Sequence, residues 1–103
     1  MLTIVGTTPV LLFEKNEKRK RISMQVQSTN VDANNTGKTF IGYGHQPVAT
    51  VGHPSQGEIL MQSDAIDQPG ASGILDKKYK GQVWAVSDTA SQSVSIDEEI
   101  EQE

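Results

Sequence analysis

The sequence predicts an all-β protein, a small antiparallel β-sandwich or jelly-roll-like barrel with extended terminal arms. Short apolar segments alternate with turn sequences rich in Gly, Asn, Asp, Ser and Pro at intervals of about 8–12 residues, a spacing typical of sandwiches and barrels. Helical periodicity is nearly absent. At 103 residues and 35% hydrophobic content, the chain fits one domain with one thin core. Within it we expect an N-terminal strand or arm at residues 1–13, a sandwich body at 16–96 and an acidic C-terminal tail at 97–103.

The amino-terminal segment predicts two short extended pieces. Met1–Val5 is apolar and strand-forming, and the GTTP sequence at residues 6–9 then interrupts any ladder. Val10–Phe13 is a continuous apolar run, which predicts a strand covered on both faces. We expect the first of these pieces to add to the edge of a neighbouring subunit's sheet, where main-chain hydrogen bonds supply affinity.

The middle of the chain predicts several strands separated by loops. The apolar Ile22, Met24 and Val26 alternate with uncharged polar residues, which is the period of two that a half-buried strand requires. Further strands are predicted at Lys38–Tyr43, Val48–Val51 and Ile59–Met61, and long loops at residues 28–38 and 64–73.

Residues 81–96 predict two strands joined by a polar turn. Trp84 is the only tryptophan, and a side chain of this size buries about 150–250 Å². We therefore expect the core to be built against the face that Trp84 shares with Val86. Val83 and Ala85 would then face a second layer or a partner subunit.

Charge is segregated along the chain. The net charge is −4, but the last seven residues carry five acids, and the remainder has nine bases against eight acids. Lys18–Arg21 is a run of four bases that predicts a solvated basic turn. No aromatic platform lies beside this run and the isoelectric point is about 5.1, so dedicated nucleic-acid binding is not expected. The basic turn and the acidic tail are complementary in sign, and we expect them to pair between adjacent subunits or each to bind a patch of opposite charge on a partner protein.

Other functional classes lack their sequence signatures. The chain contains no cysteine and no apolar run near the ~18 residues of a membrane helix, so we expect no thiolate zinc site and no membrane partner. Gly37-Lys38-Thr39 ends like a phosphate loop, but the earlier glycine and the following helix are missing. His45 and His53 have no acidic residue between them and match no metal-ligand spacing. We predict no catalytic, cofactor or metal site, and therefore no enzyme.

Several short motifs occur in a fixed order along residues 16–96. The motifs are Asn16-x-x-Arg19, Ile22-x-Met24-x-Val26-Gln27, Phe40-Ile41-Gly42-Tyr43-Gly44, Gly57-Glu58, Gly81-x-Val83-Trp84-Ala85-Val86-Ser87 and Val94-x-Ile96. In this order they resemble a group of small virion accessory proteins of tailed bacteriophages. The resemblance implies a β-sandwich, jelly-roll-like structural protein that decorates the head or belongs to the tail.

What the resemblance implies for function is adhesion without catalysis. We expect a capsid decoration, or cement, protein that binds the outer capsid surface between capsomers and stabilises the head of the virion. Its partners would be neighbouring copies of the chain and the major capsid protein, whose patches of opposite charge would bind the basic turn or the acidic tail. The alternative is a tail or fibre module that binds a host receptor, such as a saccharide.

Partner binding is expected at the terminal segments, the basic turn and a flat polar face. The uncharged surface of Gln25, Gln27, Val83 and Ala85, on a domain this small, predicts a dimer or trimer. The candidate partner-binding residues are Leu2, Ile4, Val5, Lys18, Arg19, Lys20, Arg21, Gln25, Gln27, Asp97, Glu98 and Glu99.

Overall fold

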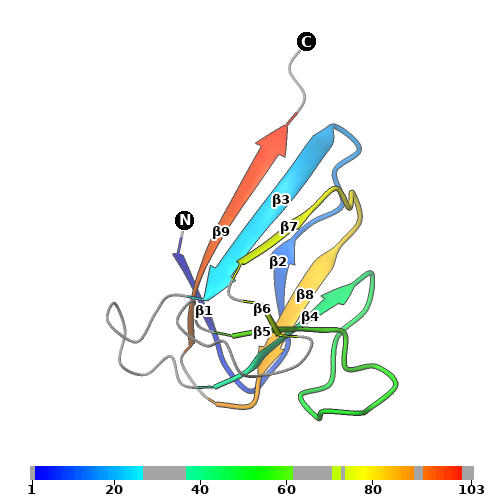
Figure 1. The fold of residues 1–103 in the computed structure, drawn as a ribbon. Coiled ribbons are helices and arrows are strands. Elements are labelled where there is room, and N and C mark those ends of the chain that lie inside the picture. Colours follow the sequence, from blue (N-terminus) through cyan, green and yellow to red (C-terminus); the bar gives the residue numbers. More distant parts are fainter. Residues whose placement is uncertain (1, 27–36, 62–70, 73, 90–91, 101–103) are drawn as a thin grey trace.

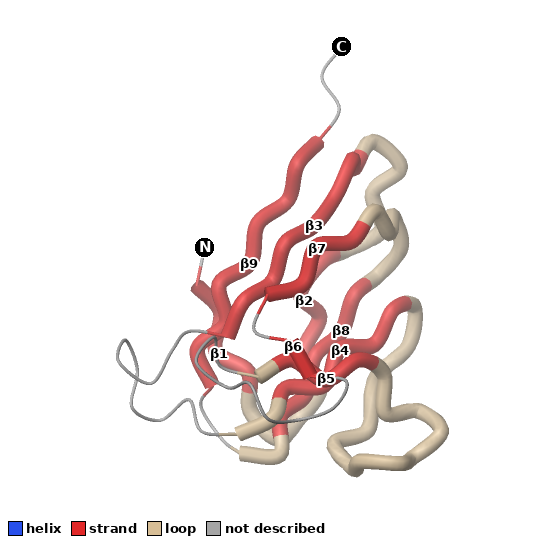
Figure 2. The backbone as a smooth tube through the Cα atoms, viewed as in Figure 1, coloured by secondary structure: helices blue, strands red, loops and turns tan. Residues whose placement is uncertain are grey.

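The structure, a computed structural model, describes residues 2–26, 37–61, 71–72, 74–89 and 92–100. These residues form β-strands that pack as two sheets, and they include no helix (Figures 1 and 2). The strands are β1 (Leu2–Val5), β2 (Val10–Phe13), β3 (Arg19–Val26), β4 (Thr39–Tyr43), β5 (Glu58–Leu60), β6 (Ala71–Ser72), β7 (Ile74–Lys77), β8 (Val83–Ser87) and β9 (Gln92–Ile100).

The two sheets have different strand orders. The first sheet has the order β1-β9-β3-β7 and is antiparallel throughout. The second has the order β2-β8-β4-β5-β6 and is antiparallel except between β5 and β6, which are parallel. The predictions of an all-β chain and of a small sandwich are therefore confirmed.

The core lies between the inner faces of the two sheets. Ile22, Met24 and Val26 alternate along β3 and are fully buried, as their period of two predicts. Burying an aliphatic side chain of this size stabilises the fold by about 1.5–3 kcal/mol. The buried members of this core are Val5, Phe13, Ile22, Met24, Val26, Ile41, Leu60, Val83, Ala85, Val94 and Ile96.

β8 and β9 are strands, as predicted, but they do not pair with each other. β8 lies between β2 and β4 in the second sheet, and β9 lies between β1 and β3 in the first (Figure 1). Val83 and Ala85 of β8 and Val94 and Ile96 of β9 are buried in the same core, which requires the two strands to belong to opposite layers. The connection between them therefore crosses from one sheet to the other.

The prediction that the core is built against Trp84 was wrong. Val83 and Ala85 are 0% exposed and point between the sheets, whereas Trp84 is half-buried on the outer face of the second sheet. Across the register, Trp84 is paired with Leu11 on β2 and with Gly42 on β4. Val83 and Ala85 face the other sheet, which is the second layer that was one of their two predicted partners. Because they are buried inside the protomer, they do not form the other, a subunit interface.

The strand predicted at Val48–Val51 is replaced by turns. The N–H of Thr50 donates to the carbonyl of Val48 over 2.8 Å, and the N–H of His53 donates to the carbonyl of Thr50 over 3.1 Å. Bonds between residues this close in sequence fold the segment on itself, so its backbone is not available to a sheet. This loop lies over the outer face of the second sheet, since a Cβ built on Gly42 would be 2.3 Å from the carbonyl oxygen of His45.

Both terminal segments belong to the first sheet. β1 pairs with β9 of its own chain, so Leu2–Val5 is not a free arm. Asp97–Ile100 continues β9 and pairs with β3, so these residues are strand rather than a solvated tail. Residues 101–103 and most of the two predicted long loops lie outside the described residues, and β6 and β7 were not predicted.

Candidate functional site

One end of the sandwich gathers most of the predicted partner-binding residues. We call it the charged end; it consists of residues 14–21, 78–82 and 97–100. The connection between β2 and β3, the connection between β7 and β8, and the last residues of β9 meet there. Arg19 opens β3 at the centre of this end, and its side chain is fully buried.

The guanidinium of Arg19 binds acceptors from three segments of the chain. Its Nε donates to Glu98 Oε2 on β9 over 2.6 Å. Its Nη1 donates to the carbonyl oxygens of Tyr79 and Gly81 over 3.0 Å each, and its Nη2 donates to the carbonyl oxygen of Glu14. A planar fork of donors suits this task, because one rigid group can satisfy several backbone carbonyls at once.

The buried position of Arg19 differs from the predicted solvated turn. Its cation lies over the ring of Phe13, 5.3 Å from the centroid, a contact that contributes about 0.5–2 kcal/mol. Burial is possible because β9 brings the carboxylate of Glu98 beside it, and an unpaired charge would not be buried. The fold therefore supplies the counter-charge from the far end of the chain.

The basic and acidic segments pair within one chain. Besides the pair between Arg19 and Glu98, Arg21 Nε lies 2.9 Å from Glu99 Oε2, and these two side chains are 58% and 51% exposed. The prediction that these segments pair between subunits was therefore wrong for these residues. The antiparallel register of β3 and β9 places Arg21 directly opposite Glu99.

Lysines cover one flank of the charged end. Lys20, Lys78 and Lys80 are exposed and, with Arg19, line a hollow of about 420 Å³. Lys80 Nζ donates to the carbonyl oxygen of Glu17 over 3.0 Å, which ties the connection after β7 to the connection before β3. Lys18 is also exposed. This flank is the basic part of the predicted site.

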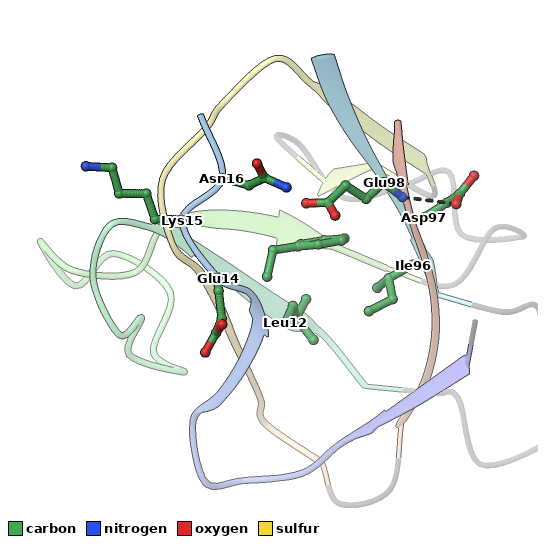
Figure 3. A pocket seen from close by; sticks show the side chains of 8 residues that line it. Leu12, Glu14, Lys15, Asn16, Ile96, Asp97 and Glu98 are labelled. Atoms are coloured by element: carbon green, nitrogen blue, oxygen red, sulfur yellow. Dashed lines mark hydrogen bonds between the residues drawn. The ribbon is translucent and has the colours of Figure 1, made fainter. Parts of the chain in front are cut away.

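A groove separates β2 from the end of β9 on the other flank (Figure 3). Its volume is about 510 Å³, and Leu12 and Ile96 lie on its two sides. Asn16 and Glu98 are directed into the space between the strands, whereas Lys15 points away from it (Figure 3). We call this space the β2–β9 groove. Its lining residues are Leu12, Phe13, Glu14, Lys15, Asn16, Ile96, Asp97 and Glu98.

An aromatic hollow lies beside the charged end. Tyr43 and Tyr79 meet edge to face, with ring centroids 5.5 Å apart and an interplanar angle of 72°. With Glu58 and Lys78 they line a hollow of about 400 Å³. Burial raises the pKa of the Tyr43 phenol well above its ordinary value, and the negative charge of Glu58 raises this pKa further.

Tyr79 was missed by the sequence analysis. It is 37% exposed, and its hydroxyl end lies against the backbone of Gly44 and Gly81, where an added Cβ would come within 2.7 and 2.5 Å of the phenol oxygen. The sequence signal was a tyrosine between Lys78 and Lys80, two residues before Gly81. A large aromatic in such a polar run is a candidate for recognition rather than for the core.

The remaining predicted residues are not brought together into one site. Val5 is fully buried in the core, whereas Ile4, next to it on β1, is 58% exposed. Leu2 belongs to the same strand. Gln25 is half-buried on β3, and Gln27 lies outside the described residues. The structure thus joins the basic and acidic candidates at the charged end and leaves β1 and Gln25 apart from them.

Comparisons with known proteins add no family to this geometry. No protein-family model, curated protein or solved structure matches the chain. Within the described ranges, no three His, Cys, Asp or Glu side chains are grouped so that they could hold a metal ion. None of the described segments is a helix of the length and apolarity needed to cross a bilayer.

Proposed function

We propose that this protein is a non-enzymatic structural protein of a tailed bacteriophage, a capsid decoration protein that stabilises the head. It binds the outer surface of the capsid between capsomers, and its partners are the major capsid protein and neighbouring copies of itself. The observation that carries the proposal is where the resembling motifs fall in the fold. They supply β3, β4, β8 and part of β9, which are interior strands of the two sheets.

This placement supports the resemblance because the resemblance implies a β-sandwich and the motif segments form strands of a sandwich. Motifs that match those of virion proteins only because they are short and apolar need not lie next to each other in the fold. Here the motif strands β4 and β8 are hydrogen-bonded neighbours in the second sheet, and β3 and β9 are neighbours in the first. The motifs therefore describe the centre of one sandwich, as expected of a jelly-roll-like virion protein.

The outer face of the second sheet offers a surface for adhesion. Leu11 and Trp84 lie opposite each other on β2 and β8, and both are only half-buried. Neither belongs to the buried clusters on the two faces of this sheet. Tryptophan is enriched among the residues that contribute most to protein interfaces, so we assign the capsid contact to this strip.

Copy number on purified virions tests the proposal. A decoration protein is present at hundreds of copies per particle, and a stained gel calibrated with the purified chain and with the major capsid protein measures this ratio. A few copies per particle would instead assign the chain to the tail. Absence from purified particles would overturn both assignments.

Two matched substitutions test the assigned contact face. Leu11→Lys places a charge on the outer face of the second sheet, whereas Ser95→Lys places one on the outer face of the first. Added back to particles stripped of the native protein, the Leu11 variant should lose occupancy and the Ser95 variant should bind like the unaltered chain. Equal occupancy of both variants would show that this strip does not contact the capsid.

The aromatic hollow favours one second candidate, a tail or fibre module that binds a saccharide. Tyr43 and Tyr79 offer ring surface for sugar C–H groups, and Glu58 and Lys78 offer polar groups beside it. In this case Tyr79→Ala would abolish binding to host-cell saccharides. A low copy number per virion, together with that loss, would support this candidate against decoration.

A further inference from the structure

The last strand of the first sheet extends past its neighbour on one side. β1 ends its pairing with β9 where Leu2 lies opposite Ser95. On its other side, β9 remains paired with β3 as far as Ile100, which lies opposite Arg19. Along Asp97–Ile100, no strand among the described residues covers the side of β9 that faces away from β3.

The backbone of this segment shows which groups face outward. The N–H of Glu98 donates to Oδ1 of Asp97 over 3.0 Å (Figure 3). A bond to the preceding side chain is what an N–H on a free strand edge makes in place of a ladder bond. Since N–H groups alternate between the two edges of a strand, the N–H of Ile100 faces the same way as that of Glu98.

The free edge opens onto the β2–β9 groove. Four residues in extended conformation span about 13 Å, so Asp97–Ile100 is long enough to template a short added strand. The groove beside it has a volume of about 510 Å³, with the apolar side chains of Leu12, Phe13 and Ile96 among its walls. An added strand would therefore find main-chain partners along β9 and an apolar surface for alternate side chains.

The charge around the edge selects the occupant. Glu14, Asp97 and Glu99 are exposed around the edge and the groove, and of these Glu99 is paired with Arg21. Lys15 is the one base that lines the groove, and it lies 3.3 Å from Glu17 and points away (Figure 3). The uncompensated charge is negative, so a segment with basic side chains fits the site and an acidic one is repelled.

We infer that the β2–β9 groove accepts an extended basic segment of a partner protein, which adds as a further strand along Asp97–Ile100. The segment's main chain replaces the Asp97 carboxylate as the acceptor for the Glu98 N–H. Its lysine or arginine side chains meet Glu14 and Asp97. Strand addition depends on local geometry and not on where the protein is located, so it is independent of the proposed role on the capsid.

Hydrogen exchange of the isotope-labelled chain measures strand addition directly. The probes are capped octapeptides that alternate Lys with Thr, the same length alternating Glu with Thr, and a Lys peptide interrupted by Pro. If the Lys-Thr peptide has a dissociation constant of about 0.1 mM, about 1 mM of it slows exchange at the Glu98 and Ile100 amides about tenfold. The Glu-Thr and Pro-interrupted peptides should leave both rates unchanged.

Two pairs of outcomes decide the inference. No slowing by the Lys-Thr peptide would overturn the inference, because no strand would then add to this edge. Equal slowing by the Pro-interrupted peptide would also overturn it, because the peptide would then bind through its charge without pairing as a strand. Glu14→Gln should weaken the Lys-Thr peptide about threefold, whereas Asp88→Asn, which removes an exposed carboxylate that does not line the groove, should not weaken it. Equal weakening by both variants would mean that the peptide does not lie in the groove.

Discussion

Replacing Arg19 by methionine should destabilise the protein more than any other change at the charged end. The substitution keeps a long side chain against Phe13 but removes every donor of the guanidinium. It leaves the Glu98 carboxylate, whose side chain is 26% exposed, without its cation. It also leaves the carbonyl groups of Tyr79 and Gly81 without their donor.

The size of the effect follows from these contacts. Removing one partner of a buried ion pair costs about 3–5 kcal/mol. A buried carbonyl left without a hydrogen bond costs about 1–3 kcal/mol. Only part of this cost is expected here, because water can reach some of these carbonyl groups once the guanidinium is removed. We expect a loss of about 4 kcal/mol, a large share of a total stability of about 5–15 kcal/mol.

Arg21 is the matched control for Arg19. It lies two residues further along β3 and is paired with Glu99, but both of these side chains are more than half exposed. Exposed pairs of this kind contribute about 0–1 kcal/mol, so Arg21→Met should change stability little. Urea unfolding followed by far-ultraviolet circular dichroism measures both variants. If Arg19→Met does not fold, Arg19→Lys, which keeps the charge, should fold and be less stable than the unaltered chain.

The reasoning about Arg19 has a clear refutation. Equal unfolding free energies for the Arg19 and Arg21 variants would mean that the buried guanidinium contributes no more than a surface cation. An Arg19→Met variant as stable as the unaltered chain would show that its acceptors are satisfied equally well by water.

Three other changes test separate parts of the fold. Because burial raises the pKa of Tyr43, its neutral form stabilises the fold fully below pH ~10 and this contribution is lost as pH rises further; unfolding free energies at pH 8 and 11 should fall less for Tyr43→Phe than for the unaltered chain. Trp84→Ala should cost about 1–2 kcal/mol rather than the ~3–5 of a core aromatic, and its fluorescence should be quenched appreciably by acrylamide; emission fully shielded from acrylamide would contradict a half-buried ring. Gly57→Ala should destabilise more than Gly52→Ala in thermal unfolding, because both have positive φ but only at Gly57 would the Cβ meet a backbone atom, 2.1 Å from the carbonyl oxygen of Ile41; equal losses would contradict that close approach.

Local pattern was sufficient where a strand has one polar face. In β3 the alternation of Ile22, Met24 and Val26 with polar residues predicted both the strand and its buried side. In β8 both faces are apolar, so alternation does not say which one is inside, and the size of Trp84 suggested the wrong one. The inner positions are instead held by the smaller Val83 and Ala85, which allow the two sheets to pack closely.

Contacts between residues far apart in the sequence could not be predicted from the local sequence pattern. The connection between β8 and β9 has the same local signal whether it closes a hairpin or crosses between sheets, so only the packing of the two layers decides. Arg19 lies in a run of bases that is typical of a solvated turn, and its burial depends on Glu98, which is 79 residues away. The β2–β9 groove could not be predicted for the same reason, since its two sides come from opposite ends of the chain.

The pairing of β9 also determines when the domain can fold during synthesis. β9 follows the other described strands in the chain, yet it lies between β1 and β3, which are among the first of them. Until it leaves the ribosome, β1 has no neighbour, Arg19 has no carboxylate, and the inner face of β3 lacks Val94 and Ile96 beside it. Pairings over such sequence separations form slowly because the chain entropy is lost before the contacts are gained. The first sheet therefore cannot form until β9 has been synthesised, although β1 and β3 precede it by many residues.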